Sequence, residues 1–367
     1  MFKRLVFLMA LLFLVAGQAI AGTVDLPQTG QTNTFTQWAK TYGGQNSDGA
    51  SSIKQTSDGG YIVAGTAGSF STGNDFMGPD EVWVLKFDAN GDIQWQKVYK
   101  NAEWEGYSVT AVEVTNDGGY ILAGNAMTCY EDEGLLCLGY GWLLKIDANG
   151  EILWQKGYKD TGVYWGNGFS AVQQTKDGGY IAVGLGGEGG WTTGHPKLWV
   201  VKVDNNGNVE WQRIFDYVVV IDSVPTSIAD SYANSVQQTK DGGYIVAGTI
   251  FIYTETGYYD IWVLKLDSNG DMEWHKIYRR DSVADVAYSI RQTSDDGYIV
   301  AGQTASSTVY GVAGLLLKLD KDGYIEWQKN YENTGGQLIQ IVNQTDDGGY
   351  VVGGLYQQEG GVVVKLN

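Results

Sequence analysis

Residues that carry most catalytic and metal chemistry are scarce in this chain, which has two cysteines and two histidines among 367 residues. A catalytic thiol needs a nearby histidine, and neither His195 nor His275 is close in sequence to Cys129 or Cys137. The sequence also has no Ser/His/Asp pattern, no metal-ligand spacing and no phosphate-binding loop. It therefore predicts no cofactor and no metal ion. For an exported chain it predicts a short-range disulfide between Cys129 and Cys137.

Long hydrophobic runs are missing too, since the run from Leu5 to Ala16 is too short to span a bilayer. Two basic residues precede this run and Ala19-Ile20-Ala21 follows it, which is the pattern of a secretory signal peptide with its cleavage site. We expect residues 1–21 to be the signal peptide and residues 22–34 a short tail. The mature protein is then secreted, periplasmic or on the cell surface, with no membrane span.

Positive charge is also in short supply, with 24 Lys and Arg against 42 Asp and Glu and a net charge of −18. A field of this sign repels nucleic acid and anionic lipid. We therefore expect no nucleic-acid partner, although the charge alone does not identify the partner that the protein has.

One phrase recurs six times along the chain. Its tyrosine follows Asp-Gly-Gly or Asp-Asp-Gly, and the copies, 52 to 64 residues apart, have this tyrosine at Tyr61, Tyr120, Tyr180, Tyr244, Tyr298 and Tyr350. A second phrase, WVLKFDANGDIQWQKVY in the first copy, recurs at 83–99, 142–158, 199–215, 262–278 and 315–331. The last copy stops at VVVKLN (362–367), and a W-x-K-x-Y segment stands at 38–42 instead. Periods of this length are typical of repeat architectures.

Each repeat predicts four short strands, which in the first copy lie at 51–56, 61–65, 83–88 and 93–99. Asp-Gly and Asn-Gly pairs between apolar runs are strong hairpin signals, because glycine adopts a positive φ at little cost. No segment of the mature chain sustains a helical period. All four prolines lie outside the repeated strands, as strands paired on both sides require.

A single four-stranded sheet of this size cannot bury both of its apolar faces, whereas six sheets stacked around an axis can. The sequence therefore predicts an all-β fold, a six-bladed β-propeller over residues 35–367 with four antiparallel strands in each blade. We expect blades at 45–99, 100–158, 159–215, 216–278, 279–331 and 332–367, the last completed by 35–42. The N-terminal strand with Trp38 would pair with the strand that contains Lys365 and close the ring.

The D-x-N-G-x-x-x-W phrase resembles the turn and tryptophan of quinoprotein-like and outer-membrane-assembly propellers, although Asp88 to Trp95 is one residue shorter and there are six repeats, not eight. The chain is more similar to exported bacterial and archaeal repeat proteins built from DGGYIVAG…WVLKLDxNGxxxWxK units. This resemblance covers most of the chain and implies the propeller fold. It implies no settled activity and no cofactor site.

Residues that recur in every blade are expected to pack the blades together rather than to form a site. Ten of the thirteen tryptophans and the six repeated tyrosines fall in this class. A lysine also recurs, at Lys86 and its equivalents, and a buried lysine would need carboxylate or carbonyl partners, for which Asp88 and the turn aspartates are candidates. The D-x-N-x-D sequence at 88–92 lacks the spacing of an EF-hand loop and predicts a hairpin turn.

One polar residue in each innermost strand is expected to face the central channel. These residues stand at equivalent positions: Lys54, Glu113, Gln173, Gln237, Arg291 and Asn343. Their mixed charges argue against an ion-selective pore.

The connections that differ between repeats are expected to lie together on one face, where propeller-like scaffolds place recognition. The predicted ligand-binding residues are aromatic and belong to these loops: Trp104, Trp165, Trp191, Tyr130, Tyr164 and Tyr259. Aromatic rings with nearby acids and amides suit stacking on sugar rings or gripping a peptide. The alternative is that these rings merely pack the loops together.

Two classes of function remain. The first is a non-enzymatic binding or cell-surface interaction module that recognises a glycan, a peptide or another component of the cell envelope. The second is a polysaccharide-active hydrolase that uses two loop carboxylates as acid and base. A pair of carboxylates about 5 to 10 Å apart in an aromatic-lined groove would favour the hydrolase, whereas loop acids scattered around the rim would favour binding.

Overall fold

A computed structural model describes most of the chain after residue 39. The described residues are 40–43, 48–68, 81–100, 104, 106–130, 136–159, 167–187, 195–221, 224–253, 257–279, 284–305, 312–331, 337–356 and 360–366. They form β-strands and connecting turns, and none of them is helical. These ranges accordingly contain no helix of the length and apolar character that crosses a membrane. The predicted signal peptide and tail, residues 1–34, lie outside them.

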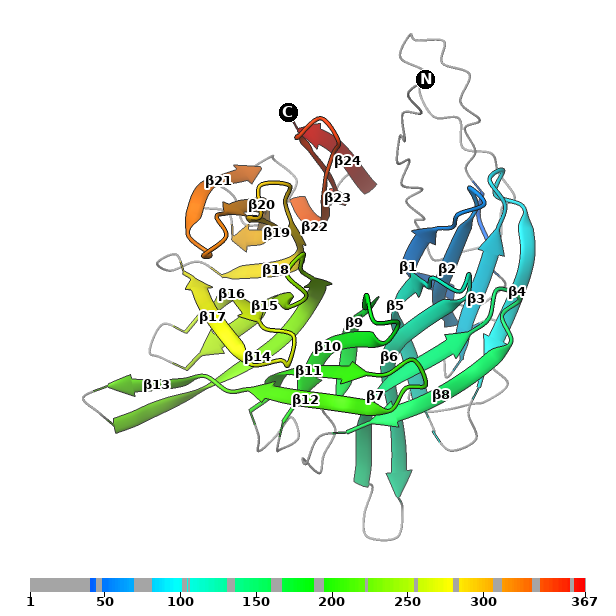
Figure 1. Ribbon diagram of the computed structural model, residues 1–367, viewed down its shortest axis with the longest axis horizontal. Helices are drawn as coiled ribbons and strands as arrows, with labels where there is room; N and C mark the ends of the chain where they lie inside the picture. Colours follow the sequence, from blue (N-terminus) through cyan, green and yellow to red (C-terminus); the bar gives the residue numbers. More distant parts are fainter. Residues whose placement is uncertain are drawn as a thin grey trace.

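Six sheets follow one another along the chain and form blades one to six around an arc (Figure 1). Blade one consists of β1 (Asp48–Gln55), β2 (Tyr61–Ala67), β3 (Val82–Phe87) and β4 (Ile93–Tyr99). Blade two consists of β5 (Gly106–Val114), β6 (Tyr120–Tyr130), β7 (Leu136–Ile146) and β8 (Ile152–Tyr158). Blade three consists of β9 (Gly168–Gln174), β10 (Tyr180–Gly186), β11 (Lys197–Val203) and β12 (Val209–Phe215).

Blades four to six vary this plan. Blade four consists of β13 (Val218–Ile221), β14 (Val224–Gln238), β15 (Tyr244–Ile252), β16 (Tyr259–Leu266) and β17 (Met272–Tyr278). Blade five consists of β18 (Asp285–Gln292), β19 (Tyr298–Ala305), β20 (Val312–Leu319) and β21 (Ile325–Tyr331). Blade six consists of β22 (Gln337–Gln344), β23 (Tyr350–Tyr356) and β24 (Gly360–Leu366).

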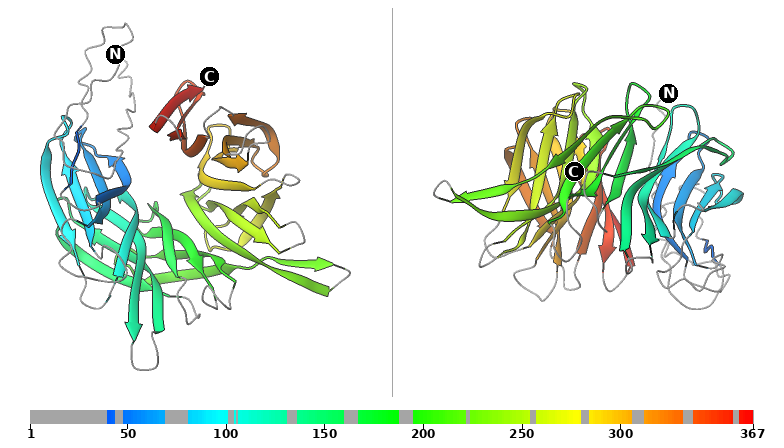
Figure 2. Two further views of the ribbon diagram at one scale, coloured as in Figure 1. Left: turned by 180° about the vertical axis from the view of Figure 1, so that it is seen from behind. Right: turned by 90° about the horizontal axis from the view of Figure 1, so that it is seen from below.

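The predicted six-bladed propeller of antiparallel strands is therefore confirmed, with two departures. In blade four the 15-residue β14 extends beyond the usual length and pairs with the additional strand β13, so this sheet has five strands. The β13–β14 hairpin projects away from the arc of blades (Figure 2). In blade six the described residues supply three strands, and the predicted fourth, which contains Trp38, falls mostly outside them.

Two kinds of turn recur in the blades, and a carboxylate organises each. In the D-G-G turn Asp58 Oδ1 accepts the backbone N–H of Gly60 at 3.0 Å. In the D-x-N-G turn Asp88 Oδ1 accepts the N–H groups of Asn90 and Asp92 at 2.8 and 2.9 Å. Asp88 is thus committed to its own turn, and of the two candidate partners of the repeated lysine it is the turn aspartate Asp58 that pairs with Lys86.

The repeated lysine is buried and its partner is the aspartate of the D-G-G turn. In blade three Lys202 is 2% exposed, and its Nζ lies 2.8 Å from Glu210 Oε2, 3.0 Å from Asp177 Oδ2 and 3.2 Å from the carbonyl O of Val203. The same ammonium-to-aspartate pair occurs at Lys86, Lys145, Lys265 and Lys318. A buried ammonium is tolerated because its donors are all used, and it ties the first turn to the third and fourth strands.

The second glycine of D-G-G makes room for this lysine. A Cβ at Gly179 would lie 2.3 Å from the carbonyl O of Val203 and 2.6 Å from Lys202 Nζ.

In blade one the hydrogen bond from Lys86 lowers the pKa of Asp58 to about 2, from a usual value of 3.8. Because the folded-state pKa is the lower one, this pair stabilises the fold above about pH 4, and the contribution is lost as the pH falls toward 2.

Neighbouring blades bury their faces against each other. The face of blade one that carries Ile62 and Val84 packs on Leu122 and Leu144 of blade two, and similar clusters join each later pair. Polar contacts reinforce the seams, since the hydroxyl of Tyr99 donates to the carbonyl O of the glycine in the next D-x-N-G turn at 2.8 Å. The outer-strand tryptophan also meets the D-G-G tyrosine of the next blade edge-on, with ring centroids 5.8 to 6.1 Å apart at five seams. The repeated aromatics therefore pack blades, as predicted.

The six polar residues of the innermost strands share one register position, opposite the residue after the D-G-G tyrosine. Lys54 forms an ion pair with Glu113 of the next blade. Gln173 Oε1 accepts the backbone N–H of Gln238 at 2.6 Å, again across a seam. These side chains thus link neighbouring blades along the inner strands, and their orientation toward a central channel stays a prediction.

The two cysteines lie in the long β6–β7 hairpin of blade two. Cys129 and Cys137 are direct cross-strand partners in its register. Such a position suits a short-range disulfide, but the side chain of Cys137 lies outside the described residues, so the disulfide stays a prediction.

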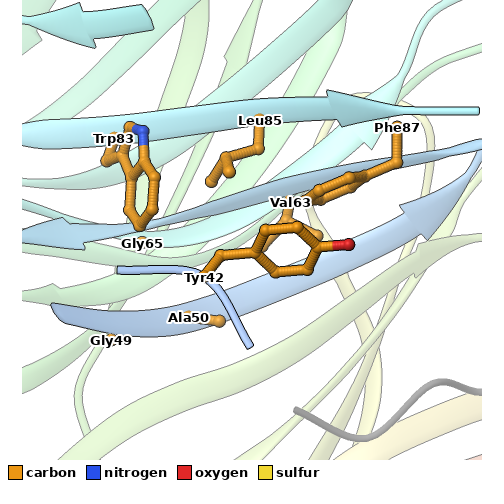
Figure 3. Close-up of a pocket in the computed structure, with 8 residues that line it drawn as sticks. All are labelled: Tyr42, Gly49, Ala50, Val63, Gly65, Trp83, Leu85 and Phe87. Atoms are coloured by element: carbon orange, nitrogen blue, oxygen red, sulfur yellow. The ribbon is translucent and has the colours of Figure 1, made fainter. Parts of the chain in front are cut away.

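Residues 40–42 contact blade one in the way that the fourth strand of one blade contacts the next. The Tyr42 hydroxyl donates to the carbonyl O of Gly91 at 2.5 Å, and Lys40 Nζ lies 2.6 Å from Asp92 Oδ1. Figure 3 shows Tyr42 over the apolar face of blade one next to Phe87, with ring centroids 4.6 Å apart. The segment therefore has the position on blade one that the predicted closing strand requires.

Lys365 has the environment expected of a blade that lacks its outer strand. Its Nζ pairs with Asp347, but the side chain is 50% exposed, whereas its five equivalents are almost fully buried. In blades three to five a fourth-strand glutamate completes the lysine site, and in blade one Gln94 does so at 2.9 Å. By repeat position Gln37 is the corresponding residue for Lys365, so ring closure would bury this lysine.

Replacing the buried lysine is expected to destabilise the protein more than replacing an exposed one. Lys202→Met should lower the free energy of unfolding by about 2 kcal/mol, because it breaks a buried pair whose acids remain partly hydrated. Lys97→Met removes the exposed pair with Glu151 and should cost less than about 0.5 kcal/mol. Urea unfolding monitored by tryptophan fluorescence measures both, and equal losses would contradict the structural role given to Lys202.

Ring closure can be tested by adding a carboxylate at the predicted seam. If Gln37 lies beside Lys365, Gln37→Glu should change stability by the same sign and amount as Gln94→Glu beside Lys86. We expect a gain of about 1 kcal/mol for each, since a charged acceptor bonds an ammonium more strongly than a neutral one. A clear gain for Gln94→Glu with none for Gln37→Glu, in the same urea titration, would show that the ring is not closed by this segment.

Candidate functional site

The antiparallel order within each blade sends alternate connections to opposite ends of the strands. The D-G-G and D-x-N-G turns lie on one end, here called the turn face, and they scarcely change between blades. The connections between second and third strands, and between blades, lie on the other end, here called the loop face. These differ in every blade, and variable connections on a rigid scaffold are where binding residues concentrate.

Part of the predicted site can be located on the loop face. Three of its six residues lie outside the described residues: Trp165, Trp191 and Tyr164. Tyr130 is described as the last backbone position of β6, without its side chain. Trp104 and Tyr259 are described in full, but they belong to blades two and four and contact different neighbours.

Trp104 packs against the body of blade two. Its half-buried ring lies 6.5 Å from that of Tyr140, and a Cβ at Gly157 would come within 2.9 Å of its indole. It also borders the apolar cluster between blades one and two. These contacts give Trp104 a packing role, which is the alternative that the sequence left open.

Tyr259 belongs to a group that combines aromatic, acidic and imidazole side chains. This group, here called the loop-face cluster, consists of His195, Asp230, Phe251, Tyr253 and Tyr259. It joins residues from blade three and from three consecutive strands of blade four. It is the clearest convergence of polar and aromatic groups on the described part of the loop face.

The extended strands of blade four build the cluster. Asp230 on β14 lies opposite Phe251 on β15, which in turn lies opposite Tyr259 on β16, so one row of the sheet carries all three. The neighbouring residue Ser231 attaches β14 to blade three, because its N–H donates to the carbonyl O of Pro196 at 2.8 Å. This bond brings the adjacent His195 to Asp230.

Asp230 uses both carboxylate oxygens to hold its neighbours. His195 Nδ1 lies 2.8 Å from Oδ1, and the Tyr253 hydroxyl donates to Oδ2 at 2.5 Å. The hydrogen bond to Asp230 raises the pKa of Tyr253 to about 12. The carboxylate therefore acts as an anchor for two other side chains.

The three aromatic rings of the cluster pack against one another. The ring centroid of Phe251 lies 4.9 Å from that of Tyr253 and 4.9 Å from that of Tyr259. The His195 ring meets Tyr253 edge-on at 5.1 Å. Tyr253 is 47% and Tyr259 is 42% exposed, so ring surface remains open to solvent.

His195 supplies a polar group beside these rings. A carboxylate only accepts, so Nδ1 carries the proton that bonds Asp230, and in the neutral ring Nε2 is left as an acceptor. The histidine side chain is 37% exposed. An apolar ring surface bordered by an oriented acceptor can bind a ligand that has both a flat apolar side and hydroxyl groups.

Two other described carboxylates of the loop face, Asp260 and Glu81, are engaged in ion pairs. Asp260 is buried, and Arg279 Nε donates to its Oδ2 at 2.8 Å. Burial is the main cause that raises the pKa of Asp260. Glu81 has the equivalent position in blade one and pairs with Lys100. These acids brace the ends of the strands and do not converge on the loop-face cluster.

A metal site is not evident in the described part of the chain, where no three of its His, Cys, Asp and Glu side chains gather closely enough to hold an ion. His275 stands on the outer strand of blade four, where Gln96 and Gln212 stand in blades one and three. Its Nδ1 accepts the indole N–H of Trp262 at 3.2 Å, just as those glutamines accept the equivalent indoles. His275 is therefore a substitute for glutamine in a packing contact.

The sequence indicated only part of this cluster. Tyr259 was predicted as a binding residue, and the loop of His195 stands out because no other repeat has it. Asp230 was not predicted, because nothing in the sequence around it distinguishes it from other acidic residues of the chain. The unusual length of β14 is the signal that could have drawn attention to it.

Comparisons with known proteins place the chain by fold alone. No family model matches the sequence, and no curated protein matches it either. An α-L-arabinanase from Penicillium chrysogenum, solved with arabinobiose, is similar in structure with a TM-score of 0.50 and 11% identity, over 86% of this chain and 92% of the arabinanase.

Two further solved structures are less similar. The soluble aldose sugar dehydrogenase of Escherichia coli has a TM-score of 0.45 and 8% identity, over 87% of this chain and 96% of that one. A protein of unknown function from Bacteroides caccae has a TM-score of 0.42 and 12% identity, over 79% and 81%. At these identities the likeness extends to the fold alone.

The anchoring role of Asp230 predicts a change in the titration of Tyr253. In Asp230→Asn the phenol loses its charged acceptor, so its pKa should fall from about 12 toward the ordinary value of 10. The ¹³Cζ shift of labelled tyrosine, with the Tyr253 signal assigned by its loss in Tyr253→Phe, reports this titration by NMR. An unchanged titration in the variant would mean that Asp230 does not hold Tyr253.

Proposed function

We propose that this protein is an exported, non-enzymatic binding module that recognises a glycan through the loop-face cluster. The observation that carries the proposal is the exposed ring surface of Tyr253 and Tyr259, both packed on Phe251, beside the oriented imidazole of His195. Sugar rings present C–H groups on their faces and hydroxyls on their edges. An aromatic surface with polar groups at its border matches both features.

Several points support binding rather than hydrolysis. A glycosidase needs one carboxyl that can give a proton and one carboxylate that can attack or activate water. Asp230 is held by His195 and Tyr253, and Asp260 is held by Arg279. Asp230 and Asp260 are therefore both engaged in structural contacts. A polysaccharide hydrolase is the alternative that the experiment below must exclude.

The remaining features are consistent with a binding role outside the cytoplasm. The first 21 residues have the pattern of a signal peptide, and the strongly negative charge disfavours nucleic acid. Trp191 belongs to the same loop as His195, and we include it with Trp165 and Tyr164 among the residues proposed to extend the binding surface. A peptide or another envelope component is the competing ligand class.

The proposal is tested on a combined glycan and peptide array, followed by calorimetry with the best ligand. Tyr259→Ala and Tyr253→Ala should each weaken binding about tenfold, since stacking on one ring contributes about 1 to 1.5 kcal/mol. Trp191→Ala tests whether Trp191, in the same loop as His195, belongs to the binding surface. Tyr324→Ala is the matched control, because Tyr324 is 62% exposed on the opposite, turn face.

Two outcomes would contradict the proposal. Binding that survives both tyrosine substitutions would place the ligand elsewhere on the molecule. Release of reducing sugar ends from a bound polysaccharide, lost when a loop carboxylate is changed to its amide, would identify a hydrolase. A loss of binding confined to the loop-face variants supports the proposed non-enzymatic binding module.

A further inference from the structure

We infer that the loop-face cluster selects neutral glycans over acidic ones, and that His195 is the residue that reads a sugar hydroxyl through Nε2. This inference rests on the proposed function and adds the ligand class and a specificity-determining residue. It follows from the hydrogen bonds of Asp230 and from the distribution of charge around the cluster.

The first step concerns the state of the imidazole. Asp230 Oδ1 occupies Nδ1 of His195 at 2.8 Å, which orients the ring and assigns the proton of the neutral form to Nδ1. Nε2 is then an acceptor on a side chain that is partly open to solvent. A ligand that meets this atom must bring a donor, and a sugar hydroxyl does so, whereas a carboxylate does not.

The second step concerns charge. Asp230 places a negative charge at the cluster. Two cations at neighbouring strand ends of the loop face are already used, since Lys197 Nζ pairs with Asp216 Oδ2 at 2.7 Å and Arg279 pairs with Asp260 at 2.8 Å. An acidic ligand would therefore approach a carboxylate with no uncommitted cation among these groups, on a protein of net charge −18. Like charges disfavour that complex.

The third step concerns the aromatic surface. Tyr253 has its hydroxyl bonded to Asp230, so its ring is held in place before a ligand arrives. Phe251 meets this ring edge-on and also packs against Tyr259. A preorganised apolar surface costs little entropy on binding. Its ligand needs an exposed C–H face next to a hydroxyl, which pyranose and furanose rings provide.

Calorimetry of the full mature protein with defined hexasaccharides tests the inference. The probes are xylohexaose, arabinohexaose and cellohexaose, which are neutral, and hexagalacturonate, which is acidic. We expect the best neutral probe to bind at least about tenfold more tightly than hexagalacturonate. Equal or tighter binding of hexagalacturonate, with the affinity still lost in Tyr259→Ala, would overturn the selectivity while leaving the proposed glycan site intact.

Two substitutions of His195 separate its contact with the ligand from its contact with Asp230. Glutamine places its amide where Nε2 lies and can accept from a hydroxyl, whereas asparagine places its amide where Nδ1 lies and keeps the bond to Asp230. We expect His195→Gln to weaken the best neutral probe less than about threefold and His195→Asn to weaken it about five- to tenfold, as expected for one lost hydrogen bond.

The reverse order would show that His195 acts only by bracing Asp230, and it would overturn the assigned role. Far-ultraviolet circular dichroism and thermal unfolding verify that both variants fold. If either is unfolded, the comparison of neutral and acidic probes on the wild-type protein still decides the ligand class. A wild-type protein that binds none of the four probes and no glycan on the array would instead contradict the proposed function itself.

Discussion

Each blade depends on its neighbours, because a sheet that is apolar on both faces cannot keep both of them from water by itself. Ile62 and Val84 on one face of blade one are buried by Leu122 of blade two, and the pattern passes from seam to seam. The opposite face of blade one carries Trp83 and Phe87, and of the described residues outside this blade it is Tyr42 that covers it. Closure of the ring is therefore the condition on which the burial of the first and last blades depends.

Much of the fold could be predicted from the sequence because repeated residues make repeated contacts. The tyrosine of the outer strand donates to the glycine carbonyl of the next D-x-N-G turn from Tyr99, Tyr158 and Tyr278, and Tyr42 makes the same contact with Gly91. The residues that recur in the sequence are therefore those that form the interfaces between blades. The partner of the repeated lysine was harder to predict, because two aspartates lie at suitable spacing. Asp88 is excluded only by its hydrogen bonds to its own turn, which the spacing does not reveal.

For the candidate site, the sequence predicted only the face of the propeller on which it lies and the aromatic character of its residues. Tyr259 was found because aromatic residues in non-repeated loops are informative, whereas Asp230 acquires its role from the register of β14 and from a contact with another blade. The site is possible because the two faces are stabilised separately. Buried lysines lock the turn face, and ion pairs brace strand ends on the loop face. One of these is charge-reversed, with Lys197 and Asp216 at the positions where blade four has Asp260 and Arg279. Loops can then vary in sequence without loosening the sheets.

The most direct test of a closed ring is hydrogen exchange at the outer edge of β24, read residue by residue by NMR or by mass spectrometry with electron-transfer fragmentation. Closure by the N-terminal segment predicts that the amides of β24 that do not bond β23 are protected as strongly as those of β20, the equivalent strand of blade five, which has β21 beside it. Rapid exchange of these β24 amides alongside slow exchange in β20 would contradict the closed ring and the stacking argument that rests on it.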